Sequence, residues 1–237
     1  FKQMAKNAME QIYANGHIPI VVGGTGFYIQ ALLYDIDFTS TAQDDTYRAE
    51  LENLVKEKGA AYLHNMLRKV DPKSAEDIHA NNVKRVIRAL EYYRQTGQKM
   101  SEHNEEERRK ESPYEFVYFV LNAPREQLYA RIDRRVDQMI EEGLVDEVKH
   151  LKELGCTKEM VSMQGLGYKE ILAYLDGECD LDTAVYTIKR DTRHFAKRQL
   201  TWFRRERQVT WIQKEVYDYD EDRILKAMLS HLEGRIC

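Results

Sequence analysis

The sequence has little cysteine and no long hydrophobic run. Its 237 residues include three cysteines, Cys156, Cys179 and Cys237, which lie far apart without a paired spacing. Neither a disulfide framework nor a cysteine zinc site is therefore expected, and reduced thiols are typical of the cytoplasm. No apolar run is long enough to cross a bilayer, and no signal peptide opens the chain. We expect a soluble, cytoplasmic protein with no membrane partner, and a monomer.

Patterns of metal ligands and catalytic nucleophiles are also missing. The seven histidines are scattered, with no two on one helix face. Neither protein-bound zinc nor a Ser-His-Asp triad is therefore expected. The formal net charge of -4 argues against a protein that coats nucleic acid indiscriminately. A surface for an anionic partner must be local.

One such local basic surface is present toward the C-terminal end. Residues 188–205, "IKRDTRHFAKRQLTWFRR", contain seven Lys or Arg and one Asp. At helical spacing, Lys189, Arg193 and Lys197 form one stripe. A solvated charged face is the ordinary interpretation, but solvated faces usually mix both signs. We therefore predict an anionic polymer as partner, and we expect Trp202 to lie in the core more readily than to stack on a base.

Apolar runs separated by helical patterns predict an α/β fold. Short strands are expected at 18–22, 116–121 and 208–212, and strands joined by helices predict a parallel sheet. Three strands alone leave edges uncovered, and the first helical stripe, residues 1–15, begins without a capping residue. We expect the other strands of the sheet to lie upstream of the printed sequence.

A helical insertion is predicted within this core. From 44 to 97 the pattern is almost wholly helical, and a helix over 82–97 places the basic residues of 84–88 opposite its apolar face. The charge-dense segment 101–112 has no apolar face, so we expect a loop or a frayed helix there. The predicted domains are an α/β core of residues 1–40 and 111–237 and a helical insertion of residues 41–110.

Two further features could bind a phosphorylated ligand. The segment "VVGGTGFY" follows a predicted strand with glycines and Thr25, at the edge where parallel sheets bind ligands. It lacks the lysine of a phosphate-cradling loop, so a plain glycine turn is the alternative interpretation. The helix "REQLYARIDRRVDQM" carries Arg131, Arg134 and Arg135, which cannot all point one way. One inward arginine could bind a diphosphate, whereas a solvated basic face is the alternative.

Four motifs, taken together and in this order, resemble the tRNA dimethylallyltransferases. They are "VVGGTGFYIQALL", "AEDIHANNVKRVIRALEYYRQTG", "MQGLGYKEILAYLDGE" and "RHFAKRQLTWFRR". The resemblance implies transfer of a dimethylallyl group from its diphosphate to the exocyclic amine of the adenine just 3′ of the tRNA anticodon. It also implies a P-loop-like α/β core with a helical insertion that contacts the anticodon stem, binding of nucleotide (ATP) and RNA, and Mg²⁺ acting with the diphosphate.

The resemblance also assigns roles to residues. Thr25 matches the threonine of the family's "GGT" and is implied to lie near the target nucleotide, and Arg135 matches the arginine of its "RI..R" helix and is implied to lie near the diphosphate. Both are predicted to be catalytic. The predicted tRNA contacts are Arg48, Lys84, Arg85, Val86, Ile87, Arg88, Gln164, Gly165, Leu166, Gly167, Tyr168, Lys169, Lys197, Arg198, Gln199, Leu200, Thr201, Trp202, Phe203 and Arg204.

The chain also departs from the family pattern. Ala80 and Asn82 stand where the family usually has Pro and Asp, and Asp45 stands where it often has Pro. The family's N-terminal phosphate-binding loop and general-base aspartate have no counterpart here, so we expect the printed sequence by itself to be inactive. Two alternatives stay open. One is an enzyme that prenylates free adenine nucleotides, which would not need the helical insertion; the other is an RNA-binding protein without catalysis.

Overall fold

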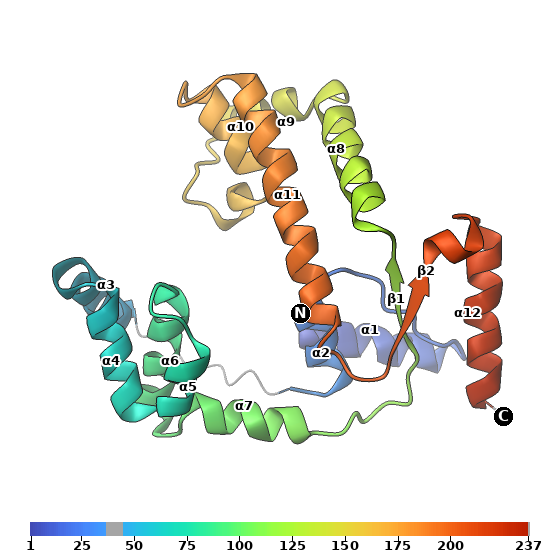
Figure 1. Ribbon diagram of the computed structural model, residues 1–237, viewed down its shortest axis with the longest axis horizontal. Coiled ribbons are helices and arrows are strands. Elements are labelled where there is room, and N and C mark those ends of the chain that lie inside the picture. The colour runs from blue at the N-terminus through green and yellow to red at the C-terminus, as the bar shows by residue number, and fades with distance from the viewer. Residues whose placement is uncertain (37–44, 237) are drawn as a thin grey trace. The chain divides into compact units, whose positions relative to one another are not determined.

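The computed structural model describes residues 1–36 and 45–236 (Figure 1). The chain divides into two compact units, one of Phe1–Gly23 with Phe27–Glu115 and one of Gly24–Gly26 with Phe116–Cys237. The domain boundaries predicted from the sequence stay a prediction, and residues 41–44 of the predicted insertion lie outside the described residues.

The elements of the first unit are all helical: α1 (Lys2–Ala14), α2 (Gly26–Leu33, of which Gly26 belongs to the second unit), α3 (Asp45–Lys58), α4 (Ala60–Val70), α5 (Pro72–Asp77), α6 (Val83–Thr96) and α7 (Met100–Arg109). The second unit contains β1 (Tyr118–Asn122), α8 (Arg125–Glu141), α9 (Leu144–Glu153), the short 3₁₀ helix η1 (Val161–Gln164), α10 (Tyr168–Leu175), α11 (Leu181–Phe203), β2 (Val209–Gln213), η2 (Lys214–Tyr217) and α12 (Glu221–Ile236).

β1 and β2 form a two-stranded parallel sheet, in which Tyr118 pairs with Val209 and Asn122 with Gln213. Parallel neighbours need a crossover connection, and here the connection runs through α8, α9, α10 and α11 (Figure 1). The second and third predicted strands are therefore confirmed as a small parallel sheet in a mostly helical chain. The crossover helices share one buried apolar cluster, made of Val136, Leu144, Val148, Met163, Ile171, Leu172, Ala184 and Ile188.

The first predicted strand is wrong. Residues 18–22 do not have strand geometry, and the side chains of Ile20 and Val22 are 85% and 89% exposed. A strand buried on both faces needs backbone partners along its edges, and neither β1 nor β2 pairs with this segment. Apolar composition predicts how readily a segment becomes a strand, but the pairing itself depends on neighbours.

The helical prediction for 44–97 is confirmed from Asp45 onward. Side chains at helical spacing on α3, α4 and α6 meet in a second buried cluster. Gly97 follows α6 with φ +70°, the left-handed conformation that glycine adopts without strain, and so ends the helix where the sequence predicts. The cluster contains Leu51, Leu63, Leu67, Ala75, Ile78, Val86, Ile87, Ala89 and Leu90.

Asp71 accounts for the helix that replaces the loop expected over 101–112. Its buried carboxylate accepts hydrogen bonds from the backbone N–H and hydroxyl of Ser74, at 3.0 and 2.6 Å, and from those of Ser101, at 3.0 and 2.7 Å. Burial by itself raises the pKa of Asp71, but these four bonds together outweigh burial and hold the pKa below its usual value. One carboxylate thus caps α5 and the first turn of α7, so the expectation of a loop or frayed helix is wrong as far as Arg109.

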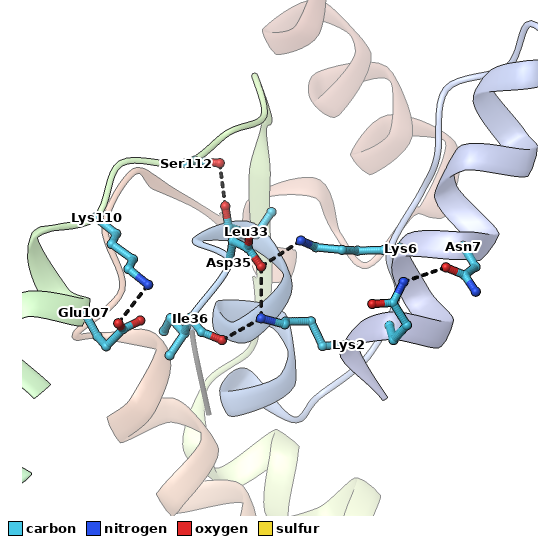
Figure 2. Close-up of polar contacts among 10 residues, drawn as sticks. Lys2, Lys6, Asn7, Leu33, Asp35, Ile36, Glu107, Lys110 and Ser112 are labelled. Carbon is cyan, nitrogen blue, oxygen red and sulfur yellow. Dashed lines mark hydrogen bonds and ion pairs between the residues drawn. The ribbon is translucent and has the colours of Figure 1, made fainter. Parts of the chain in front are cut away.

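An ion cluster holds the turn after α2 (Figure 2). The Nζ atoms of Lys6 and Lys2 lie 2.7 and 3.0 Å from Oδ1 of Asp35. Hydrogen bonds from Lys6 and Lys2 lower the pKa of the Asp35 carboxyl. Asp35 has φ +48°, in a left-handed region that Asp tolerates better than most residues. The Ser112 hydroxyl also donates to the Leu33 carbonyl at 2.6 Å, so segments from both ends of the first unit fix this turn.

Candidate functional site

The glycine turn that contains Thr25 packs against the end of α11. Thr25 is exposed and directly precedes α2, whereas Gly26 is buried. The Gln199 side-chain amide donates to the Gly24 carbonyl at 2.7 Å. A Cβ atom added at Gly26 would lie 2.2 Å from Cδ1 of Trp202, and one added at Gly24 would lie 2.4 Å from Nε2 of Gln199. Neither glycine has a positive φ, so the close approach of the Trp202 ring is what requires glycine at position 26, whereas at position 24 the Gln199 amide, at the end of a flexible side chain, could move aside.

Cationic side chains surround a shallow hollow beside this turn. The hollow has a volume of about 400 Å³ and is open to solvent. Within the described residues, no acid lies in ion-pair range of Lys197, Arg198, Arg204 or Arg205. Uncompensated cations around a hollow favour an anionic ligand. The hollow is lined by His194, Lys197, Arg198, Thr201, Trp202 and Arg205.

The predicted stripe along α11 is cationic only toward its C-terminal end. Lys189 Nζ lies 2.6 Å from Oδ1 of Asp137, and Arg193 Nη1 lies 2.6 Å from Oδ1 of Asp133, both acids being on α8. The inference that the bases of this stretch lack compensating acids is therefore wrong for two of the three stripe residues, because their acids come from a neighbouring helix. Lys197 is the member of the stripe that keeps its charge available.

The three arginines of α8 all lie at the surface. Arg131, Arg134 and Arg135 are exposed, so the inward-pointing arginine considered from the sequence is not present. The Arg135 guanidinium pairs with the Glu142 carboxylate at 3.1 Å near the end of the helix. The catalytic role predicted for Arg135 stays a prediction.

The loop from Gln164 to Lys169 is held by Glu170. Its buried carboxylate accepts a hydrogen bond from the backbone N–H of Gly167 at 2.9 Å, where Gly167 has φ +100°. Lys169 Nζ lies 3.3 Å from the same carboxylate, and the Tyr168 hydroxyl donates to Glu147. Gln164, Gly165, Leu166 and Lys169 are exposed, so they are the members of this predicted RNA-contacting loop with accessible surface.

In the helical unit, the predicted RNA contacts differ in accessibility. The Arg48 guanidinium donates from Nε and Nη2 to both carboxylate oxygens of the buried Glu91, each at 2.8 Å, a bidentate pair that holds α3 on α6. Val86 and Ile87 belong to the apolar cluster and are buried. Their side chains are thus unavailable to RNA, and the segment presents only Lys84, Arg85 and Arg88.

The predicted RNA contacts in the last turn of α11 also include both buried and exposed residues. Phe203 is buried and packs edge-on against Tyr118 of β1, with ring centroids 6.2 Å apart. Leu200 is half-buried, whereas Thr201 and Arg204 are exposed. The Thr201 hydroxyl donates to the Lys197 carbonyl at 2.9 Å, a bond within its own helix. Phe203 is therefore a core residue, and its assignment as an RNA contact does not fit its burial.

Sequence reasoning missed Glu206, which follows α11. Burial raises the pKa of its carboxyl, while the nearby charge of Arg207 acts to lower it. His194 and Arg205 were also missed as members of the hollow. Arg205 lies within the basic stretch, which was the available signal for it, whereas nothing in the local pattern distinguishes Glu206 from an ordinary surface acid.

Resident metal ligands are not gathered anywhere in the described part of the chain. Among residues 1–36 and 45–236, no three His, Cys, Asp or Glu side chains form a group that could hold a metal ion. In the same residues, no helix is both long enough and apolar enough to cross a membrane.

Comparisons with known proteins identify the family of this chain. Residues 1–206 match the model of the family described as IPP transferase. A curated tRNA dimethylallyltransferase from Lachnoclostridium phytofermentans is 60% identical over 232 residues, which cover 98% of this chain and 74% of that protein.

Solved structures give the same result. The full-length tRNA isopentenylpyrophosphate transferase from Bacillus halodurans is 40% identical with a TM-score of 0.60, over 97% of this chain and 75% of that chain. A eukaryotic dimethylallyltransferase acting on tRNA is 30% identical with a TM-score of 0.74, over 96% of this chain and 59% of that chain. The chain belongs to the IPP transferase family.

Proposed function

We propose that this protein transfers a dimethylallyl group from dimethylallyl diphosphate to the exocyclic amine of the adenine 3′ of the anticodon in tRNA. The observation that carries the proposal is the juxtaposition, within one compact unit, of the Thr25 turn and the uncompensated cations at the end of α11. Membership of the IPP transferase family supports the reaction class. A P-loop-like core, a cytoplasmic location and a monomeric state are further parts of the proposal.

The cations fit a nucleic acid better than a small substrate. Lys197, Arg198, Arg204 and Arg205 follow one another over little more than two helical turns, and cations spaced in this way neutralise successive phosphates of a backbone. An amine on a stacked base is out of reach, so the base must be turned out at a cost of a few kcal/mol, which backbone contacts offset. Binding of the RNA backbone and access to the amine are therefore linked requirements.

The reaction then needs few groups. The amine nitrogen attacks the allylic carbon, the bond from that carbon to the diphosphate oxygen breaks, and the diphosphate leaves with the electron pair. The nitrogen loses a proton to a general base. Thr25 would hydrogen-bond near the target nucleotide through its exposed hydroxyl, and Arg135 would stabilise the charge that grows on the diphosphate, if it exchanges its partner Glu142 for the phosphates.

Magnesium would arrive with the diphosphate. Mg²⁺ is usually bound by one or two carboxylates together with substrate phosphates, and the described residues gather no cluster of three metal ligands. No step above depends on the ion.

A transfer assay with two acceptors tests the proposal. The full-length protein, as its gene encodes it, is incubated with dimethylallyl diphosphate and Mg²⁺, and with either unmodified tRNA or AMP. We expect a mass increase of one dimethylallyl group on tRNA and none on AMP. Transfer to AMP alone would instead support the nucleotide-prenylating alternative, and RNA binding without transfer to either acceptor would support the non-catalytic one.

A further inference from the structure

The Thr25 turn has no freedom to move toward α11. The added Cβ at Gly26 meets the Trp202 ring at 2.2, 2.4 and 2.9 Å, distances far below ordinary van der Waals contact, so the backbone itself lies against the indole. Gln199 adds a hydrogen bond to the carbonyl of Gly24. Thr25 is therefore bracketed by two residues that α11 holds in place.

Gln199 and Trp202 reach the turn from one side of the helix. Residues three apart on a helix are neighbours on its surface, which lets both side chains contact Gly24 to Gly26 together. Lys197, Arg198 and Thr201 instead line the hollow, and Trp202 lines it as well. The Trp202 ring thus contacts both the turn and the hollow where an anion would bind.

The end of α11 that carries Trp202 is held in place by packing against β1. The neighbour of Trp202 on this helix, Phe203, is buried and packs edge-on against Tyr118 of β1. Displacement of the helix end would break this contact. A rigid support of this kind is what an exposed catalytic hydroxyl needs.

Taking the proposed transfer reaction as given, we infer that Gln199 and Trp202 act as positioning residues for Thr25, and that their main effect on the reaction passes through the Gly24–Gly26 turn rather than through contact with RNA. Misplacement of a reacting group by about 1 Å can slow a reaction about 100-fold. Loss of an aromatic stacking platform would instead weaken RNA binding by about 5- to 150-fold. The two roles therefore predict changes in different constants.

Four variants and two matched controls separate these roles in the full-length protein. The variants are Trp202→Ala, Gln199→Ala, Gly26→Ala and the double variant Gly26→Ala/Trp202→Ala. Trp211→Ala, in β2, controls for loss of a half-buried indole, and Gly23→Ala controls for a glycine turn, since a Cβ there meets nothing within 4 Å. For each protein, kcat, KM for tRNA, Kd for tRNA and Tm are measured.

We expect Trp202→Ala and Gly26→Ala to lower kcat about 10- to 100-fold with unchanged Kd for tRNA. Gln199→Ala should have a smaller effect of the same kind. The double variant should be no worse than the poorer single variant, because removing the indole makes room for the added methyl group. A fall in tRNA affinity that accounts for the whole loss of kcat/KM in Trp202→Ala would overturn the positioning role, as would unchanged kcat in both single variants.

Failure of the proposed function is distinguishable from failure of the positioning role. If the wild-type protein transfers no dimethylallyl group, the proposed function is wrong. The Tm values of the variants then test whether the turn packs closely on the Trp202 indole. A Tm loss in Gly26→Ala that disappears on the Trp202→Ala background would support the close packing of the turn on the indole. Additive Tm losses would show that the two sites do not interact and would overturn it.

Discussion

At the scale of single residues, Glu206 links stability to pH. Burial raises the pKa of its carboxyl, so the folded state binds the proton more tightly than the unfolded state does. The stability that this group contributes is fully present below the ordinary glutamate pKa, about 4.3, and is lost as pH rises through the folded pKa. At neutral pH the ionised carboxylate is therefore a cost to folding.

We predict that Glu206→Gln matches or exceeds the wild-type Tm at pH 7. The amide has a similar shape and removes the half-buried charge, and the difference from wild type should shrink as pH falls below about 4. Thermal melts between pH 4 and 8 measure this, with exposed Glu215→Gln as the control that shows no such trend. A Glu206→Gln variant less stable than wild type at pH 7 would contradict the conclusion that the ionised Glu206 carboxylate destabilises the folded protein.

Also at the residue scale, the three exposed arginines of α8 can be distinguished by kinetics. We predict that Arg135→Ala lowers kcat by about 100- to 1000-fold, the usual loss when one group that stabilises transition-state charge is removed, with little change in Kd for tRNA. Arg134→Ala, also exposed on α8, is the matched control and should retain activity. A loss confined to tRNA affinity in Arg135→Ala would remove its predicted catalytic role.

At the scale of elements, Asp71 joins helices that lie apart in the sequence. It accepts from the N-terminal turn of α5 and from that of α7, 30 residues further on. Apolar periodicity predicts α3, α4 and α6 because each has a stripe that the others bury. α7 has no such stripe, and its first turn depends on a carboxylate supplied from elsewhere. This is why a pattern-based prediction assigned a loop or a frayed helix.

We predict that Asp71→Ala lowers the free energy of unfolding by about 2–4 kcal/mol, because it leaves buried N–H donors without an acceptor and removes a helix cap. Amide hydrogen exchange should accelerate first at Ser74 and Ser101. Asp77→Ala, an exposed change within α5, is the control and should cost much less. Retained protection at Ser101 in the Asp71 variant would show that α7 does not need this cap.

At the scale of the whole molecule, only part of the basic charge on α11 is available to a partner. We predict that Lys197→Ala/Arg198→Ala reduces the slope of log K against log salt for tRNA binding by about 2, since each lost phosphate contact removes about 0.9. The matched control, Lys189→Ala/Arg193→Ala, changes the net charge equally on the same helix. It should alter stability and leave most of the slope, because Asp137 and Asp133 already neutralise these cations. Equal slopes in the two double variants would contradict this division.

Local sequence patterns accounted for much of the fold. The helices within 45–96 and the cationic α11 were predicted, and the strands predicted at 116–121 and 208–212 are found at 118–122 and 209–213. Motif order alone identified the family. Each of these depends on spacing within a short segment, which is fully visible in the sequence.

By itself, then, the sequence determined most of the helices, the two segments that pair as β1 and β2, and the chemistry class to which the motifs belong, but it also predicted a strand at 18–22 that does not form and missed the regular helix α7. Only the tertiary structure decided which cations stay available, since Arg193 finds its acid 60 residues away, and which motif residues are buried, as Val86 and Phe203 are. It also decided that Trp202 lies against Gly26. The physical reason is the same in each case: periodicity is set by neighbours along the chain, whereas charge compensation and close packing are set by neighbours in space.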